Sequence, residues 1–239
     1  MKIIILSFLS FFTIAVQAQK IPHLKPFKHI TLPVGEPSDL GFSPDGKTMF
    51  IASDQGFLYE TDLEGKVIRK ADYEIIDCEG IFIDDKYVYV AEETTRKVKL
   101  FDIKTLKLER TVYLPYSGAR NKGYEGLTFN KTRNRFAIVT EKDPIYIFEL
   151  DLDMRVVNEI DVSKMARDIS SISYHDNFIW MLSDEDRTVF KVNPDTYEVI
   201  AKWIVPIPNP EGLAFDDNGN MLIQSDDLNA LYFFKTPQN

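Results

Sequence analysis

Short apolar runs alternate with polar turns along most of this chain. The first run of each unit covers residues 37–42, 78–83, 124–129, 169–174 and 210–215. A turn rich in Asp and Asn follows, and then a second apolar run, at residues 48–52, 87–91, 135–139, 178–182 and 221–224. Asp, Asn and Gly accept the tight backbone geometry of hairpin turns. Nearly continuous apolar runs of this length are typical of strands buried on both faces. The pattern therefore predicts five buried hairpins.

Two further strands complete each unit. A third strand is predicted at residues 98–102 and 145–150, for example, and the fourth alternates apolar and polar residues, as in residues 199–204. This alternation is typical of a half-exposed strand. The equivalent positions of the five units lie 41, 46, 45 and 41 residues apart, at Ser38, Glu79, Glu125, Ser170 and Glu211. A period of about 40–45 residues is typical of four-stranded propeller blades.

The two ends of the chain complete one blade. The last unit ends at residues 231–235 without a fourth strand, and a spare strand at residues 27–33 precedes the first unit. Placing the spare strand on the last blade closes the ring and removes its open edges. We therefore predict an all-β, five-bladed β-propeller of four-stranded blades, forming a single domain over residues 19–239. Six blades are the alternative, which needs a blade that the sequence does not show.

The N-terminal 18 residues have the features of a signal peptide. Lys2 precedes an apolar stretch at residues 3–16, and Val16 and Ala18 supply the small residues for cleavage before Gln19. An uncleaved anchor is the alternative. We expect an exported protein, periplasmic or extracellular, for which membrane association stays open. Its one cysteine, Cys78, excludes an intramolecular disulfide.

Acidic residues recur at one end of every predicted hairpin. The first strand of a hairpin starts where its second strand ends. The second strands end in acids at Asp54, Glu93, Glu141, Asp184 and Asp226. Glu79, Glu125 and Glu211 begin three of the first strands, and the two units with serine there have an acid two residues earlier, Glu36 and Asp168. A shift of two residues keeps a strand side chain on the same face. The repeat predicts a ring of carboxylates at one mouth of the channel.

Converging carboxylates repel one another and need compensation by raised pKa values, bases or a bound cation. We interpret the second-strand acids as braces between blades and the Glu-Gly glutamates as functional. Their glycines equally permit close approach of neighbouring backbones. Oxygen ligands at flexible spacing suit Ca²⁺ better than Zn²⁺. The hypothesis is therefore a Ca²⁺ site with ligands among Glu79, Glu125, Glu211, Glu36 and Asp168. Mouth cations are predicted at Arg120, Lys122, Lys142 and Arg187.

Three segments carry a family resemblance. They are Asn-Lys-Gly-Tyr-Glu-Gly-Leu at residues 121–127, Asp-Ile-Ser-Ser-Ile at 168–172 and Asn-Pro-Glu-Gly-Leu-Ala-Phe at 209–215. The chain resembles the SdiA-regulated (YjiK/CarP-like) β-propeller family over about residues 25–235. The resemblance implies an exported or membrane-associated propeller associated with calcium, and a distant similarity to phytase-like propellers. Two units depart from the Glu-Gly pattern, with Ser38-Asp39 and Ser170-Ser171. These departures argue against a symmetric five-fold site.

Two classes of function fit these features. We favour non-catalytic binding of a divalent cation and of a small ligand or envelope protein, because no acid stands out as a base distinct from the ligands. The alternative is a Ca²⁺-dependent phytase-like or lactonase-like hydrolase, in which Glu125 or Glu211 activates water. A protein-interaction scaffold without metal is a third possibility. The net charge of −9 argues against nucleic acid as a partner. We expect a monomer.

Overall fold

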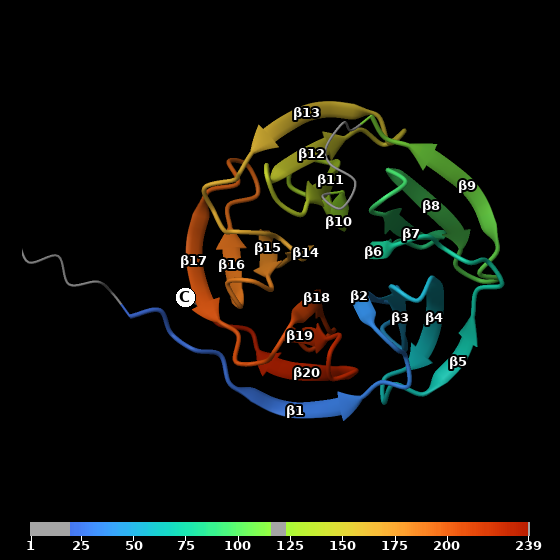
Figure 1. The fold of residues 1–239 in the computed structure, drawn as a ribbon, viewed down its shortest axis with the longest axis horizontal. Coiled ribbons are helices and arrows are strands. Elements are labelled where there is room, and N and C mark those ends of the chain that lie inside the picture. The colour runs from blue at the N-terminus through green and yellow to red at the C-terminus, as the bar shows by residue number, and fades with distance from the viewer. Residues whose placement is uncertain (1–19, 116–122, 239) are drawn as a thin grey trace, which may run out of the picture.

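Twenty strands form five four-stranded antiparallel sheets around a central channel in the computed structural model, which describes residues 20–115 and 123–238 (Figure 1). Blade 1 contains β2 (Pro37–Phe42), β3 (Thr48–Ser53), β4 (Phe57–Asp62) and β5 (Val67–Lys70). Blade 2 contains β6 (Cys78–Ile83), β7 (Tyr87–Glu92), β8 (Lys97–Asp102) and β9 (Leu108–Tyr113). Blade 3 contains β10 (Tyr124–Asn130), β11 (Arg135–Thr140), β12 (Tyr146–Leu150) and β13 (Val156–Asp161). Blade 4 contains β14 (Ser171–His175), β15 (Phe178–Ser183), β16 (Thr188–Val192) and β17 (Val199–Ile204). Blade 5 contains β18 (Pro210–Phe215), β19 (Asn220–Ser225), β20 (Ala230–Lys235) and β1 (Pro26–Thr31).

The N-terminal strand closes the ring. β1 pairs antiparallel with β20, with Thr31 opposite Ala230 and Ile30 opposite Leu231. Figure 1 shows β1 outside β20, and the inner strands β2, β6, β10, β14 and β18 around the centre. The inner strand β18 of blade 5 contacts β2 of blade 1. The prediction of five blades, with the spare strand on the last one, is confirmed.

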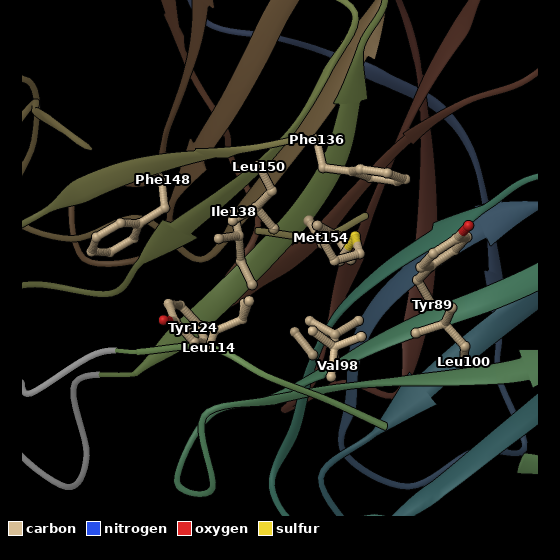
Figure 2. Packing of buried hydrophobic residues seen from close by; sticks show 13 residues of the cluster. Tyr89, Val98, Leu100, Leu114, Tyr124, Phe136, Ile138, Phe148, Leu150 and Met154 are labelled. Atoms are coloured by element: carbon tan, nitrogen blue, oxygen red, sulfur yellow. The ribbon is translucent and has the colours of Figure 1, made fainter. Parts of the chain in front are cut away.

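Apolar clusters between neighbouring blades hold the ring together. Figure 2 shows the cluster between blades 2 and 3, where Tyr89 and Leu100 face Phe136 and Ile138. Each inner sheet region has a blade on either side, so its side chains are buried on both faces. Burial of each such side chain stabilises the fold by roughly 1.5–3 kcal/mol. The described residues contain no helix that is long and apolar enough to span a membrane.

A β-bulge lies near the start of four inner strands. In β10, Tyr124 is opposite Thr140 and Gly126 is opposite Val139, which leaves Glu125 without a partner in the ladder. The same shift leaves out Ser38 in β2, Glu79 in β6, and Glu211 with Gly212 in β18. A bulge re-aims the side chain of the extra residue and commonly lies next to a functional site. The bulges therefore single out the repeated Ser and Glu positions.

Candidate metal centre in an acidic cavity

A cavity of about 660 Å³ opens at one mouth of the channel. All of its lining residues are polar or charged: Asp54, Asp77, Glu79, Glu93, Thr94, Glu125, Glu141, Lys142, Asp168, Ser170, Asp184 and Glu211. Nine of these residues are acids, contributed by all five blades. We refer to this space as the acidic cavity.

Backbone hydrogen bonds bring the two sources of acids together within blades 1, 2 and 3. The amide of Glu93, just after β7, donates to the carbonyl of Asp77, just before β6, at 2.9 Å. The amide of Glu141 donates in the same way to the carbonyl of Gly123 at 3.1 Å. In these three blades the end of the second strand is thus fastened to the segment that leads into the bulge. This is why residues about 14–16 positions apart in sequence share one mouth.

Buried polar side chains at the ends of the second strands fix the same segments. Ser53 Oγ donates to the Gly35 carbonyl at 2.6 Å, and Ser225 Oγ donates to the Pro208 carbonyl at 2.7 Å. In blade 4, Ser183 Oγ donates to Asp168 Oδ1 at 2.5 Å. The hydroxyl groups are fully buried, so these hydrogen bonds are needed to satisfy them.

Three carboxylates from blades 2 and 3 converge on one point of the cavity. Glu93, Glu125 and Glu141 each offer an oxygen, and the three oxygens lie within 4.8 Å of one another. Glu93 Oε1 accepts a 2.8 Å hydrogen bond from the Gly123 amide. Glu125 is only 7% exposed, and no described residue donates a hydrogen bond to its carboxylate. We refer to these three residues as the triad.

Crowding in the cavity raises the pKa values of several of its buried acids. Burial, followed by the charges of Glu93 and Glu141, raises the pKa of Glu125 well above its usual value. Burial and the nearby Asp77 and Glu141 raise the pKa of Glu93 to about 7, although its bond from Gly123 acts in the opposite direction. Burial and neighbouring acids likewise raise the pKa values of Glu79 and Glu211. Such crowding favours either bound protons or a bound cation.

Lys142 is the one basic residue among the described residues that line the acidic cavity. Its ammonium group pairs with the Glu141 carboxylate of the triad and lies 3.1 Å from Glu185 Oε1 in blade 4. Because Lys142 already serves two carboxylates, it neutralises little of the charge on the other acids.

Comparison with known proteins identifies the family of this propeller. The family model described as SdiA-regulated matches residues 23–235. The chain belongs to the SdiA-regulated family. Its fold is similar to that of the glutaminyl cyclase of Myxococcus xanthus, with a TM-score of 0.75 and 15% identity, covering 90% of this chain and 97% of that chain. At this identity the likeness shows the fold.

The structure brings together four of the five predicted ligands in this SdiA-regulated family member. Glu79, Glu125, Asp168 and Glu211 all line the acidic cavity. Asp168 is already engaged, because it accepts hydrogen bonds from Ser183 Oγ and from the Asp184 amide at 3.2 Å. Glu36 is exposed and does not line the cavity; its amide donates to Asn229 Oδ1 at 3.1 Å. Of the predicted ligands, only Glu125 belongs to the triad.

The structure does not place all of the predicted mouth cations at the acidic cavity. Lys142 lines the acidic cavity, whereas Arg187 is exposed and does not line it. Arg120 and Lys122 lie outside the described residues, as does the predicted signal peptide at residues 1–18.

Glu93 and Glu141 are the site residues that the sequence interpretation assigned elsewhere. Both were expected to brace neighbouring blades, because an acid recurs at the end of every second strand. Glu93 does brace blade 3 through Gly123, and it also contributes an oxygen to the triad. The sequence did contain a signal for their role. Each Glu-Gly start lies along the chain between the ends of two successive second strands, as Glu125 lies between Glu93 and Glu141.

One buried position of the inner strands breaks the five-fold repeat. It holds glycine in three blades, at Gly80, Gly126 and Gly212, but Asp39 in blade 1 and Ser171 in blade 4. Asp39 is 1% exposed; its Oδ2 accepts from the Ile81 amide at 2.9 Å, and its Oδ1 from Ser171 Oγ at 3.1 Å. Burial raises the pKa of Asp39 to about 8, against the effect of these bonds. Asp39 thus joins blades 1, 2 and 4 across the channel, in keeping with an asymmetric site.

Proposed function

We propose that this protein is an exported, non-catalytic binding propeller that holds Ca²⁺ between Glu93, Glu125 and Glu141. The convergence of these three carboxylates carries the proposal. Calcium binds oxygens at about 2.3–2.6 Å, so two oxygens on opposite sides of one ion lie about 5 Å apart. The triad oxygens, all within 4.8 Å of one another, meet this condition. The remaining positions would be filled by second carboxylate oxygens and water, as calcium sites allow.

The donor set favours a hard cation. The described lining residues offer carboxylate and hydroxyl oxygens but no histidine or cysteine, the ligands typical of zinc. Magnesium prefers a tight octahedron and retains its water, which suits a dedicated carboxylate cage less well. Glu125 is the strongest single indication, because a buried carboxylate without a donor requires either a proton or a cation.

The lining of the cavity supports binding rather than catalysis. A catalytic base would be held apart from the metal ligands, at a distinct position and with its own orienting partner. Glu125 belongs to the triad, and Glu211 accepts no hydrogen bond from a described residue that would orient it. We propose that the metal helps to present the mouth to a small ligand or an envelope protein, in a periplasmic or extracellular monomer exported through residues 1–18.

Calcium titration of the metal-free protein tests the proposal. Calorimetry should show a saturable site with a dissociation constant near the range of extracellular modules, about 10⁻⁴–10⁻³ M. Calcium at 100 times this constant should add about 2.7 kcal/mol to the free energy of unfolding. The Glu125→Gln variant should lose both effects. Glu159→Gln, which removes an exposed charge from β13, serves as the matched control. Absence of both heat and stabilisation at about 10 mM Ca²⁺ in the wild type contradicts the proposal.

A further inference from the structure

Lys142 has two carboxylate partners, and they belong to different blades. Its ammonium group pairs with Glu141 of the triad, which follows β11 in blade 3. The same group lies 3.1 Å from Oε1 of Glu185, which follows β15 in blade 4. Lys142 lines the acidic cavity, whereas Glu185 neither lines it nor belongs to the triad. One ammonium group is therefore shared between a triad carboxylate and an acid outside the cavity.

The turn that carries Glu185 is held in place from two sides. Within the turn, the Asp186 amide donates to Ser183 Oγ at 3.0 Å. From the loop before β14, Arg167 Nε donates to Asp186 Oδ1 at 2.6 Å, and Arg167 Nη2 donates to the carbonyl of Glu185. Arg167 Nη1 also lies 3.7 Å from Glu185 Oε2. These contacts fix the Glu185 backbone and leave its Oε1 facing Lys142.

A calcium ion on the triad would share Glu141 with the ammonium group. The ion would lie about 2.3–2.6 Å from an oxygen of this carboxylate, which the ammonium group already contacts. Because both are cations, binding of the ion favours departure of the ammonium group. Lysine carries its charge on a flexible four-carbon stem, and the Lys142 side chain is 31% exposed, so its ammonium group can move while its backbone stays in place. Glu185 is already within hydrogen-bond distance.

We propose that Glu185 is a positioning residue for ion exchange at the triad, which takes up the ammonium group of Lys142 when Ca²⁺ binds and returns it to Glu141 when the ion leaves. The inference rests on the proposed function and deepens it by naming how binding at that site is regulated. In the metal-free protein the ammonium group offsets part of the charge of the triad, and in the metal-bound protein the ion does so. Glu185 favours the metal-bound protein without touching the ion.

Glu185 could also favour Ca²⁺ in a simpler way, through attraction between its charge and the ion. The two effects differ in their dependence on Lys142. Attraction over a distance acts whether or not an ammonium group is present. Uptake of the ammonium group requires Lys142, so it disappears when Lys142 is replaced. A double-mutant cycle measures this dependence directly.

Calorimetric titration with Ca²⁺ of the wild type, Glu185→Gln, Lys142→Met and the double variant completes this cycle. Glu185→Gln alone should weaken Ca²⁺ binding about three- to fivefold, as expected for the loss of a partly exposed ion pair. The same substitution added to Lys142→Met should change the dissociation constant less than about twofold, because no ammonium group then needs an acceptor. Glu185→Asp keeps the carboxylate and should retain most of the wild-type affinity.

Glu36→Gln is the matched control for the loss of one negative charge at this mouth. Glu36 is exposed, and its charge acts on Asp54 of the cavity. Among the described residues, the ion pairs of Lys142 are those with Glu141 and Glu185. Glu36→Gln should therefore have the same small effect, less than about twofold, with and without Lys142→Met. Urea unfolding in EDTA should give Glu185→Gln nearly the wild-type midpoint, which shows that the variant folds.

The cycle separates failure of this inference from failure of the proposed function. An equal loss of Ca²⁺ affinity on Glu185→Gln in both backgrounds would reduce Glu185 to a distant charge and overturn the inference alone. Unchanged or tighter Ca²⁺ binding in Glu185→Gln would overturn it as well. Absence of saturable Ca²⁺ binding in the wild type would contradict the proposed function and the inference together. A loss confined to proteins that retain Lys142 supports uptake of the ammonium group by Glu185.

Discussion

The amide of Gly123 donates a 2.8 Å hydrogen bond to Oε1 of Glu93, and this bond joins blade 2 to the entrance of blade 3. It holds one carboxylate of the triad directly beside the bulge that presents Glu125. The space at Gly123 is closed to larger residues, because a Cβ there would lie 2.3 Å from the Glu93 carbonyl oxygen. The same hydrogen bond thus connects two blades and positions one carboxylate of the triad.

Lys142 should weaken calcium binding in the wild type. Its ammonium group pairs with Glu141, so an incoming ion must compete with a charge already present on the triad. Replacing Lys142 by Met keeps the aliphatic stem and removes the charge. We expect the Lys142→Met variant to bind Ca²⁺ several-fold more tightly by calorimetry. Unchanged or weaker binding would show that the ammonium group does not compete with the ion.

The metal-free protein should lose stability as the pH rises from about 4 to about 8. In the folded protein the pKa values of Glu93 and Asp168 are raised to about 7, and that of Asp54 to about 6, from ordinary values of 4.5 for Glu and 3.8 for Asp. The folded state therefore binds more protons than the unfolded state over this window, and the free energy of unfolding falls with pH.

Urea unfolding in EDTA at several pH values measures this slope. Saturating Ca²⁺ should flatten the upper part of the profile, because the ion replaces protons on the triad. The Glu125→Gln variant in EDTA should show a shallower slope than the wild type, since one group with a raised pKa is gone. A wild-type profile that is flat, or that rises with pH in EDTA, would contradict the described charge crowding.

Asp39 should contribute to stability through its bonds across the channel. Asp39→Ala leaves the buried Ile81 amide and Ser171 hydroxyl without their acceptor, and each unsatisfied group costs about 1–3 kcal/mol. We expect a loss of about 2–4 kcal/mol in the free energy of unfolding. Asp39→Asn retains a carbonyl acceptor and should lose less. Equal denaturation midpoints for the two variants would indicate that these bonds are not how Asp39 stabilises the fold.

Most of the fold could be predicted from the sequence, because the patterns that specify each strand and turn are local. Each hairpin carries its own apolar runs and turn residues, and an unpaired last strand, β20, required the spare strand β1 as its partner. The second strands extend one residue further than the apolar runs indicated, to residues such as Ser53 and Ser183. These residues are polar but buried, because their hydroxyl groups bind the preceding loops.

The residues that form the site were harder to predict from the sequence, because the site depends on contacts between blades. The expectation for Glu36 relied on the alternation of side chains in extended backbone. Glu36 instead has a φ of 46°, in the left-handed region, so the alternation does not apply to it. The convergence of Glu93 with Glu125 crosses from one blade to the next. No pattern within a single repeat reports that distance.

Gly80, Gly126 and Gly212 of the inner strands lie against the backbone of a neighbouring blade, so an added side chain should destabilise the fold there. A Cβ on Gly126 would lie 2.8 Å from the backbone nitrogen of Ile172 in the next blade. We expect Gly126→Ala to lower the free energy of unfolding by about 1–3 kcal/mol, as overpacking usually does. Gly35→Ala is the matched control, because its added methyl group meets only the flexible end of Gln55. Equal urea midpoints for the two variants would contradict close packing of the inner strands.

A crystal structure of the protein soaked in calcium chloride tests the central claim most directly. Anomalous scattering should show one calcium ion in the acidic cavity, about 2.3–2.6 Å from oxygens of Glu93, Glu125 and Glu141. Calcium bound elsewhere on the molecule, with no anomalous peak at the triad in the soaked crystal, would contradict the claim.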